Sequence, residues 1–243
     1  MKTIGLIGGM SWESTLPYYR LINEAVRERL GGLHSARLVL YSVDFHDLEQ
    51  LMQRGAWPAI GAELARAAAR LESAGADFLL LCTNTMHRVA GAIEAAVRIP
   101  LLHIVDPAAE AVRQAGLKTV GLLGTRFTME QPFYRDRLIE RHGLSVLIPG
   151  AEERAMVHRV IFEELCLGKV ADASRRGYAK VIGRLAGQGA EAVILGCTEI
   201  ALLVGPAESR VPLFDTTKLH ALKAVEWALA GQYSPGGWEA GRP

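Results

Sequence analysis

The sequence predicts an α/β protein made of two similar lobes, each built on a parallel sheet. Three observations lead to this fold class. Short β-branched or leucine-rich runs alternate with longer segments of helical periodicity. Two separate segments of the first half recur in the second half with nearly the same spacing. The 243 residues are enough for two lobes that each bury a core of their own.

The predicted strands are almost wholly apolar, as expected where helices cover both faces of a parallel sheet. Their ranges are 3–7, 37–43, 78–82, 101–104, 119–123, 145–148, 192–195 and 211–214. Two of the helices between them are well marked. Residues 17–30 repeat apolar side chains at helical spacing and end at a Gly-Gly pair, and the alanine-rich residues 58–74 end at Gly75.

The internal repeat defines the predicted lobes. Residues 75–85 (GADFLLLCTNT) align without a gap on residues 189–199 (GAEAVILGCTE), and residues 4–9 (IGLIGG) align on residues 120–125 (VGLLGT). We therefore expect two Rossmann-like lobes related by a pseudo-twofold axis, with the active site in the cleft between them. The expected boundaries are residues 1–105 plus 211–231 for the first lobe and 106–210 for the second. The glycine- and proline-rich tail, 232–243, is expected to be disordered.

Charge, hydrophobicity and cysteine content argue against nucleic acid, membranes and zinc as partners. The chain has 27 Lys plus Arg against 26 Asp plus Glu, so we expect neither nucleic acid nor a membrane surface as partner. No apolar run approaches the roughly 20 residues that span a bilayer. The apolar start is interrupted by Ser11-Trp12-Glu13, which argues against a signal peptide. Three cysteines without Cys-x-x-Cys spacing indicate neither disulfides nor zinc, and we expect a cytoplasmic protein without a metal that acts on a small molecule.

Polar residues gather where the repeated strands end. The first copy ends in Thr83, Asn84 and Thr85, and the second in residues 197–199, which are Cys-Thr-Glu. Because ligands bind beyond the carboxyl ends of parallel strands, we expect two nearly symmetric sets of hydrogen-bonding side chains to line one cleft. Met10 is expected at the cleft floor, and the loop 125–128 is expected to occupy the corresponding place in the second half.

Cys197 is the residue that points most directly to chemistry. It follows an apolar strand and precedes a helical segment, where backbone amides and a helix start lower a thiol pKa. Such a thiol suits a nucleophile or an acid/base group, although a buried structural cysteine is the alternative. The repeat pairs Cys197 with Thr83. Strand side chains alternate in direction, so we expect the neighbouring Cys82 in the core, and Cys166 on the apolar face of a helix.

Other polar residues allow two interpretations each. Residues 5–9 follow a strand but lack the G-x-G-x-x-G pattern, so close backbone approach is favoured over phosphate binding. His87 either reaches the cleft edge or packs internally. Arg54 and Lys169 are isolated cations that would suit a substrate carboxylate, or else are solvated on the surface.

Three motifs carry a resemblance to a known family. The segments GLIGGMSWEST, CTNTMH and LGCTEI, in this order, resemble the aspartate/glutamate racemase family and its amino-acid racemase branch. The resemblance extends from residue 2 to about residue 230 and implies a homodimer that works without pyridoxal phosphate or another cofactor. In this family two acid/base groups face the α-carbon from opposite sides, and one removes the proton that the other returns.

The resemblance also implies residue roles and one departure. Family members carry a cysteine at both positions, whereas here the second is Cys197 and the first is Thr83. An aliphatic alcohol is roughly seven pKa units less acidic than a thiol, so Thr83 is a poor base that still passes on a proton. We therefore expect an asymmetric racemase of aspartate or glutamate that prefers the L antipode. The residues expected to contact the substrate, besides this catalytic pair, are Met10, Ser11, Arg54, Asn84, Thr85, Thr125, Thr128, Lys169, Thr198 and Glu199.

Within this set, the small polar residues are expected to hold the α-carboxylate and the developing enediolate, and Arg54 and Lys169 the side-chain carboxylate. Two alternatives stay open. One is a decarboxylase or cis-trans isomerase of a small dicarboxylic acid that uses a single cysteine. The other is an amino-acid-binding protein that has lost the chemistry.

Overall fold

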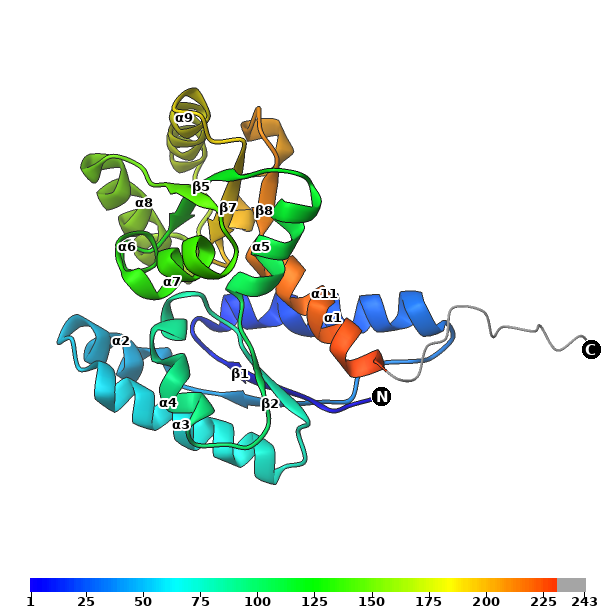
Figure 1. Cartoon of the computed structure of the whole chain (residues 1–243). Coiled ribbons are helices and arrows are strands. Elements are labelled where there is room, and N and C mark those ends of the chain that lie inside the picture. The colour runs from blue at the N-terminus through cyan, green and yellow to red at the C-terminus, as the bar shows by residue number, and fades with distance from the viewer. Residues whose placement is uncertain (231–243) are drawn as a thin grey trace, which may run out of the picture.

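The computed structural model describes residues 1–230 and has the two predicted lobes, each with a four-stranded parallel sheet (Figure 1). The strand order is β2-β1-β3-β4 in the first sheet and β6-β5-β7-β8 in the second, so the two lobes share one topology. The strands are β1 (Ile4–Gly8), β2 (Leu38–Ser42), β3 (Phe78–Leu81), β4 (Leu101–Leu102), β5 (Thr119–Gly124), β6 (Ser145–Leu147), β7 (Ala192–Gly196) and β8 (Leu213–Asp215). The two-lobed α/β fold is confirmed; the predicted tail, 232–243, lies outside the described residues.

Helices connect the strands and cover both faces of each sheet. They are α1 (Trp12–Leu30), α2 (Phe45–Gln53), α3 (Trp57–Ser73), α4 (Ala90–Glu94), α5 (Val105–Gln114), α6 (Arg126–Glu130), α7 (Pro132–Asp136), α8 (Ala151–Glu163), α9 (Asp172–Gly187), α10 (Ile200–Leu203) and α11 (Thr216–Leu229), with the short segments η1 (Thr85–Val89), η2 (Arg137–Arg141), η3 (Leu165–Leu167) and η4 (Pro206–Glu208). Within residues 1–230, none of these helices combines the length and the apolarity needed to cross a membrane.

The two faces of the first sheet bury different sets of helices. Side chains of β3 alternate, so that Leu80 and Cys82 join a core with α1 and α11, whereas Leu79 and Leu81 join a core with α2, α3 and α4. The second lobe repeats this arrangement, with α8 and α9 on one face and α5 and α7 on the other. Alternation therefore sends Cys82 into the core, as the sequence predicts.

The lobes exchange one helix each. Helix α5 follows β4 of the first sheet but packs with β5 and β7 of the second, and α11 follows β8 of the second sheet but packs against α1 of the first. The predicted boundary at residue 211 differs from the structure at one point, because β8 pairs with β7 and so belongs to the second sheet. Only the segment from Thr216 returns to the first lobe. An apolar strand carries no sign of which sheet it will join.

Gly9 forms the tight turn that leads from β1 toward the cleft. Its φ angle is +94°, and a Cβ placed there would lie 2.3 Å from the carbonyl oxygen of Val43. Both the left-handed backbone and the close approach require glycine. The Gly9 amide donates to Thr15 Oγ1 at 2.8 Å, which fixes the chain direction just before Met10 and Ser11.

Candidate active site

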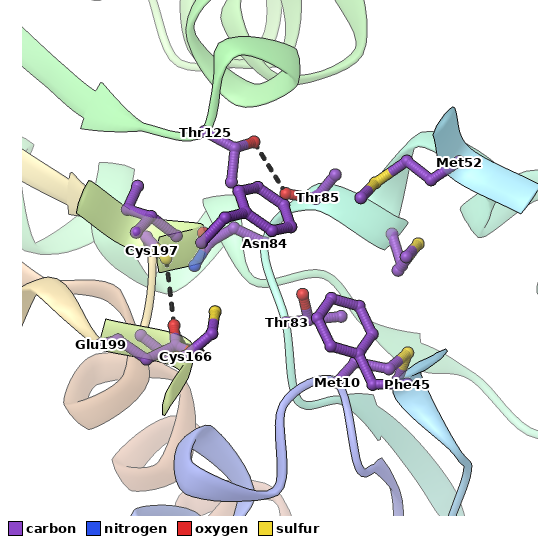
Figure 2. A pocket seen from close by; sticks show the side chains of 14 residues that line it. Met10, Phe45, Met52, Thr83, Asn84, Thr85, Thr125, Cys166, Cys197 and Glu199 are labelled. Atoms are coloured by element: carbon purple, nitrogen blue, oxygen red, sulfur yellow. Dashed lines mark hydrogen bonds between the residues drawn. The ribbon is translucent and has the colours of Figure 1, made fainter. Parts of the chain in front are cut away.

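A small chamber lies between the lobes where the central strands of both sheets end (Figure 2). Its lining is formed by Met10, Phe45, Met52, Thr83, Asn84, Thr85, Met86, Thr125, Ile161, Phe162, Cys166, Cys197, Thr198 and Glu199. The free space inside is about 20 Å³, which is room for roughly one water molecule. An amino acid therefore fits only after residues that line the chamber have moved.

The carboxylate of Glu199 gathers the polar side chains on one side of this chamber. It accepts hydrogen bonds from Cys197 Sγ at 3.0 Å, from Thr198 Oγ1 at 2.6 Å and from Ser11 Oγ at 3.0 Å. Cys166 Sγ approaches the same carboxylate at 3.6 Å. Glu199 is only 3% exposed, so these four donors supply the partners that a buried carboxylate requires.

The structure raises the pKa of Cys197, whereas the sequence predicted a lowered pKa. Burial raises the pKa of the Cys197 thiol, and the negative charge of Glu199 raises it further. The amides of a helix start were expected to lower it, but α10 spans only residues 200–203 and begins beyond Glu199. In the closed chamber Cys197 is therefore a protonated thiol whose hydrogen-bond acceptor, Glu199, is also the nearest group able to take its proton.

Replacing Glu199 by glutamine is expected to lower the pKa of Cys197, because the substitution removes a negative charge that opposes thiolate formation. The rate of iodoacetamide alkylation against pH measures this in a Cys82→Ser, Cys166→Ser background, where Cys197 is the sole thiol. The midpoint should move to lower pH relative to the same background with Glu199 intact. A midpoint that stays in place or rises would contradict a direct effect of Glu199 on Cys197.

Thr83 reaches the chamber from the first lobe, at the position equivalent to Cys197. It follows β3 and is 7% exposed. The ring of His87 holds the backbone here, since His87 Nδ1 donates to the Thr83 carbonyl oxygen at 2.8 Å while Nε2 accepts from the amide of Ile104 at 3.2 Å. Burial and the neighbouring His103 lower the pKa of His87, in agreement with this neutral form. His87 thus packs behind the chamber and orients Thr83.

Hydrogen bonds between threonines, and around Asn84, join the two lobes at the chamber. Thr85 Oγ1 lies 2.9 Å from Thr125 Oγ1, apart from the bond between Cys197 and Glu199 (Figure 2). Asn84 accepts from Tyr134 OH at 3.0 Å and donates to Thr216 Oγ1 at 3.1 Å. These bonds fix the amide orientation and leave Asn84 one N–H and one lone pair for another partner.

Most of the predicted site residues meet in the chamber. Those that line it are Met10, Thr83, Asn84, Thr85, Thr125, Cys197, Thr198 and Glu199. Ser11 and Thr128 lie directly behind the lining, where Ser11 donates to Glu199 and Thr128 lies 3.3 Å from the hydroxyl of Thr125. Their contribution to the site is therefore the positioning of lining residues.

Arg54 and Lys169 are not part of the chamber. Both are exposed, and Arg54 at the end of α2 donates to Gln50 on its own helix. The helix α2 turns Leu48 and Met52 inward, and Arg54, which follows its last residue, faces solvent. Of the two interpretations given above, solvated surface cations fit the positions of Arg54 and Lys169.

Apolar side chains complete the chamber, and sequence reasoning did not identify them. Phe45 and Met52 come from α2, and Phe162 comes from α8. The amphipathic spacing of Leu48 and Met52 was a usable signal for an inward face of α2. Cys166 was expected only on an apolar face. It does pack against the second-lobe core, but its thiol also borders the chamber and bonds Glu199.

A larger cavity adjoins the chamber next to Met52 and Phe162. Its volume is about 580 Å³, and it shares Met52 and Phe162 with the chamber. Arg88 lies there, stacked over the ring of Trp57 at 4.0 Å, together with Arg126. In the part of the chain that the structure describes, no cluster of three acidic, histidine or cysteine side chains is arranged to hold a metal ion.

Comparisons with known proteins agree with this geometry. A family model described as Asp/Glu/Hydantoin racemase matches residues 7–224. A broad specificity amino-acid racemase, RacX of Bacillus subtilis, is 22% identical over 246 residues, covering 94% of this chain and 99% of the relative.

Two solved structures are also similar. The crystal structure of a putative Asp/Glu racemase from Yersinia pestis is 55% identical with a TM-score of 0.88, covering 94% of this chain and all of the other. That of an aspartate racemase homologue from Pyrococcus horikoshii OT3 is 36% identical with a TM-score of 0.81, covering 94% and 99%. The chain therefore belongs to the Asp/Glu/Hydantoin racemase family.

Proposed function

We propose that this protein racemises amino acids without a cofactor, with Cys197 and Thr83 as its two acid/base groups. The observation that carries the proposal is their placement. They end equivalent strands of two similar lobes, and both line one closed chamber. Membership of a racemase family and the name of the Bacillus subtilis relative support an amino acid as the substrate.

The proposed reaction begins with proton transfer from Cys197 to Glu199. The thiolate then removes the α-proton of the L antipode, and the electron pair moves into the α-carboxylate as an enediolate. We propose that the free N–H of Asn84 and the hydroxyl of Thr85 donate to its oxygens, and that Thr198 does so after its hydroxyl leaves Glu199. The hydroxyl of Thr83 protonates the opposite face. Water then protonates the threonine alkoxide back to the hydroxyl, and the hydroxide formed takes the proton that Glu199 accepted from Cys197, which itself keeps the α-proton until it exchanges with solvent.

Thr83→Cys is expected to raise α-proton exchange of the D antipode by about 10-fold to 100-fold, because a thiol replaces a hydroxyl as the base on that face. Proton NMR in D₂O on separate samples of the L and D antipodes measures the two rates. Thr83→Ser is the matched control, since it keeps a hydroxyl and should keep the ratio of the rates. A ratio that Thr83→Cys leaves unchanged would remove Thr83 from the second face.

The decarboxylase and binding alternatives have separate readouts. Substrate-dependent release of carbon dioxide would indicate decarboxylation. Thermal stabilisation by an amino acid without exchange or inversion would indicate binding alone.

We also propose that the protein is cytoplasmic and that it forms a homodimer. The exposed apolar side chains of Trp12, Leu16 and Tyr19 lie along one face of α1 and support an interface there. Sedimentation velocity of the purified chain tests the dimer, and a monomer at micromolar concentration would contradict it.

A further inference from the structure

One side of the chamber is apolar. Met10, Phe45, Met52 and Phe162 line it, and Figure 2 shows Met10, Phe45 and Met52 on the side away from Glu199 and Cys166. The α-carbon must lie near Cys197 if that residue exchanges its proton, and a side chain that points away from Glu199 then meets these residues. We call Met10, Phe45, Met52 and Phe162 the apolar wall.

The charge of the chamber opposes an acidic side chain. Within residues 1–230, no lysine, arginine or histidine lines the chamber, and Glu199 contributes a buried carboxylate. The α-ammonium and α-carboxylate of a bound amino acid cancel each other. A side-chain carboxylate would add a second negative charge to a buried space without a compensating cation, which is strongly unfavourable. An uncharged side chain adds no charge.

The shape and composition of the wall favour several substrates rather than one. Methionine side chains are flexible and polarisable, and they adapt to partners of different shape. Met52 and Phe162 also border the adjoining cavity of about 580 Å³, where Arg88 and Arg126 lie, so the uncharged side chain is expected to rest on the wall itself rather than to enter this cavity. A cationic side chain would bring its charge to the wall, on the side of the chamber away from Glu199.

We infer that the substrates are amino acids with uncharged, aliphatic or thioether side chains, such as leucine and methionine, held against the apolar wall. This inference rests on the proposed racemase function. It departs from the acidic substrates that the family resemblance implied and that the names of several relatives suggest, because Arg54 and Lys169, the cations expected to hold the side-chain carboxylate, lie outside the chamber.

The test is α-proton exchange in D₂O at equal concentrations of L-leucine, L-methionine, L-aspartate, L-glutamate and L-lysine. Leucine and methionine are expected to exchange at least about tenfold faster than the charged amino acids. Faster exchange of aspartate, glutamate or lysine would overturn the inference and leave the proposed function intact. Exchange of none of the five would count against the proposed function itself.

A substitution in the wall provides a second readout. Met52→Arg places a cation against the side chain, and the ratio of kcat/KM for aspartate to that for methionine should rise by about tenfold or more. Met52→Leu is the matched control, since it keeps the wall uncharged and should keep the order of substrates. An unchanged ratio in Met52→Arg, with circular dichroism like that of Met52→Leu, would overturn the placement of the side chain.

Discussion

Cys197→Ser is expected to lower α-proton exchange of the L antipode by about 10²-fold to 10⁴-fold, the usual contribution of a positioned acid/base group. A serine hydroxyl fits the same space and still donates to Glu199. It is far less acidic than a thiol, so the anion that must take the α-proton is almost never formed. Proton NMR of the α-hydrogen in D₂O, with reductant and without pyridoxal phosphate, measures the loss.

Cys82→Ser is the matched control for this substitution. Cys82 is fully buried in the core formed with α1 and α11 and does not line the chamber. Exchange by Cys82→Ser should stay within a few-fold of the unsubstituted chain once the folded fraction is taken into account. If Cys82→Ser, still folded, lost as much exchange as Cys197→Ser, the acid/base assignment would have to move to Cys82.

Gly9→Ala is expected to destabilise the fold by about 2–5 kcal/mol, the sum of a left-handed backbone and a forced contact. The φ angle of +94° opposes any side chain, and the new Cβ would lie 2.3 Å from a backbone oxygen, which cannot rotate away. Typical domains are stable by only about 5–15 kcal/mol, so much of the stability would be lost. Equilibrium unfolding in urea measures the change.

Gly75→Ala separates the two causes. Gly75 has a φ angle of +88°, close to that of Gly9, but a Cβ there meets nothing within 4 Å. Its substitution should cost only about 1–2 kcal/mol, the backbone component. Equal losses for Gly9→Ala and Gly75→Ala would show that the segment around Val43 gives way freely and that the close contact has no energetic weight.

The fold was predictable where the sequence repeats and where strands alternate. The duplicated segments place Thr83 and Cys197 at equivalent strand ends, and alternation sends Cys82 into the core. The sequence predicted that the C-terminal segment returns to the first lobe, but not that this return begins only after β8. An amphipathic helix shows that one face is buried but not which sheet buries it, and the same holds for the short strand β8.

The site was predictable for residues that follow the central strands, because strand ends converge by topology. It was not predictable for Phe45, Met52 and Phe162, which reach the chamber from helices distant in sequence. The raised pKa of Cys197 was also not predictable. It depends on burial and on the distance to Glu199, and the residues next to Cys197 in the sequence determine neither. Arg54 and Lys169 were chosen for their charge, and charge alone does not bring a side chain into a cavity.

The unequal residues at the two equivalent strand ends have a kinetic consequence. L and D antipodes have the same free energy in water, so kcat/KM for inversion must be equal in both directions, whatever stands at positions 83 and 197. The inequality appears instead in how the carbanion partitions. Cys197 reprotonates it more readily than Thr83, so most L molecules return to L, and they carry deuterium when the thiol has first exchanged its proton with D₂O. The ratio of deuterium uptake to loss of optical rotation therefore gives a lower limit for the difference between the thiol and the hydroxyl.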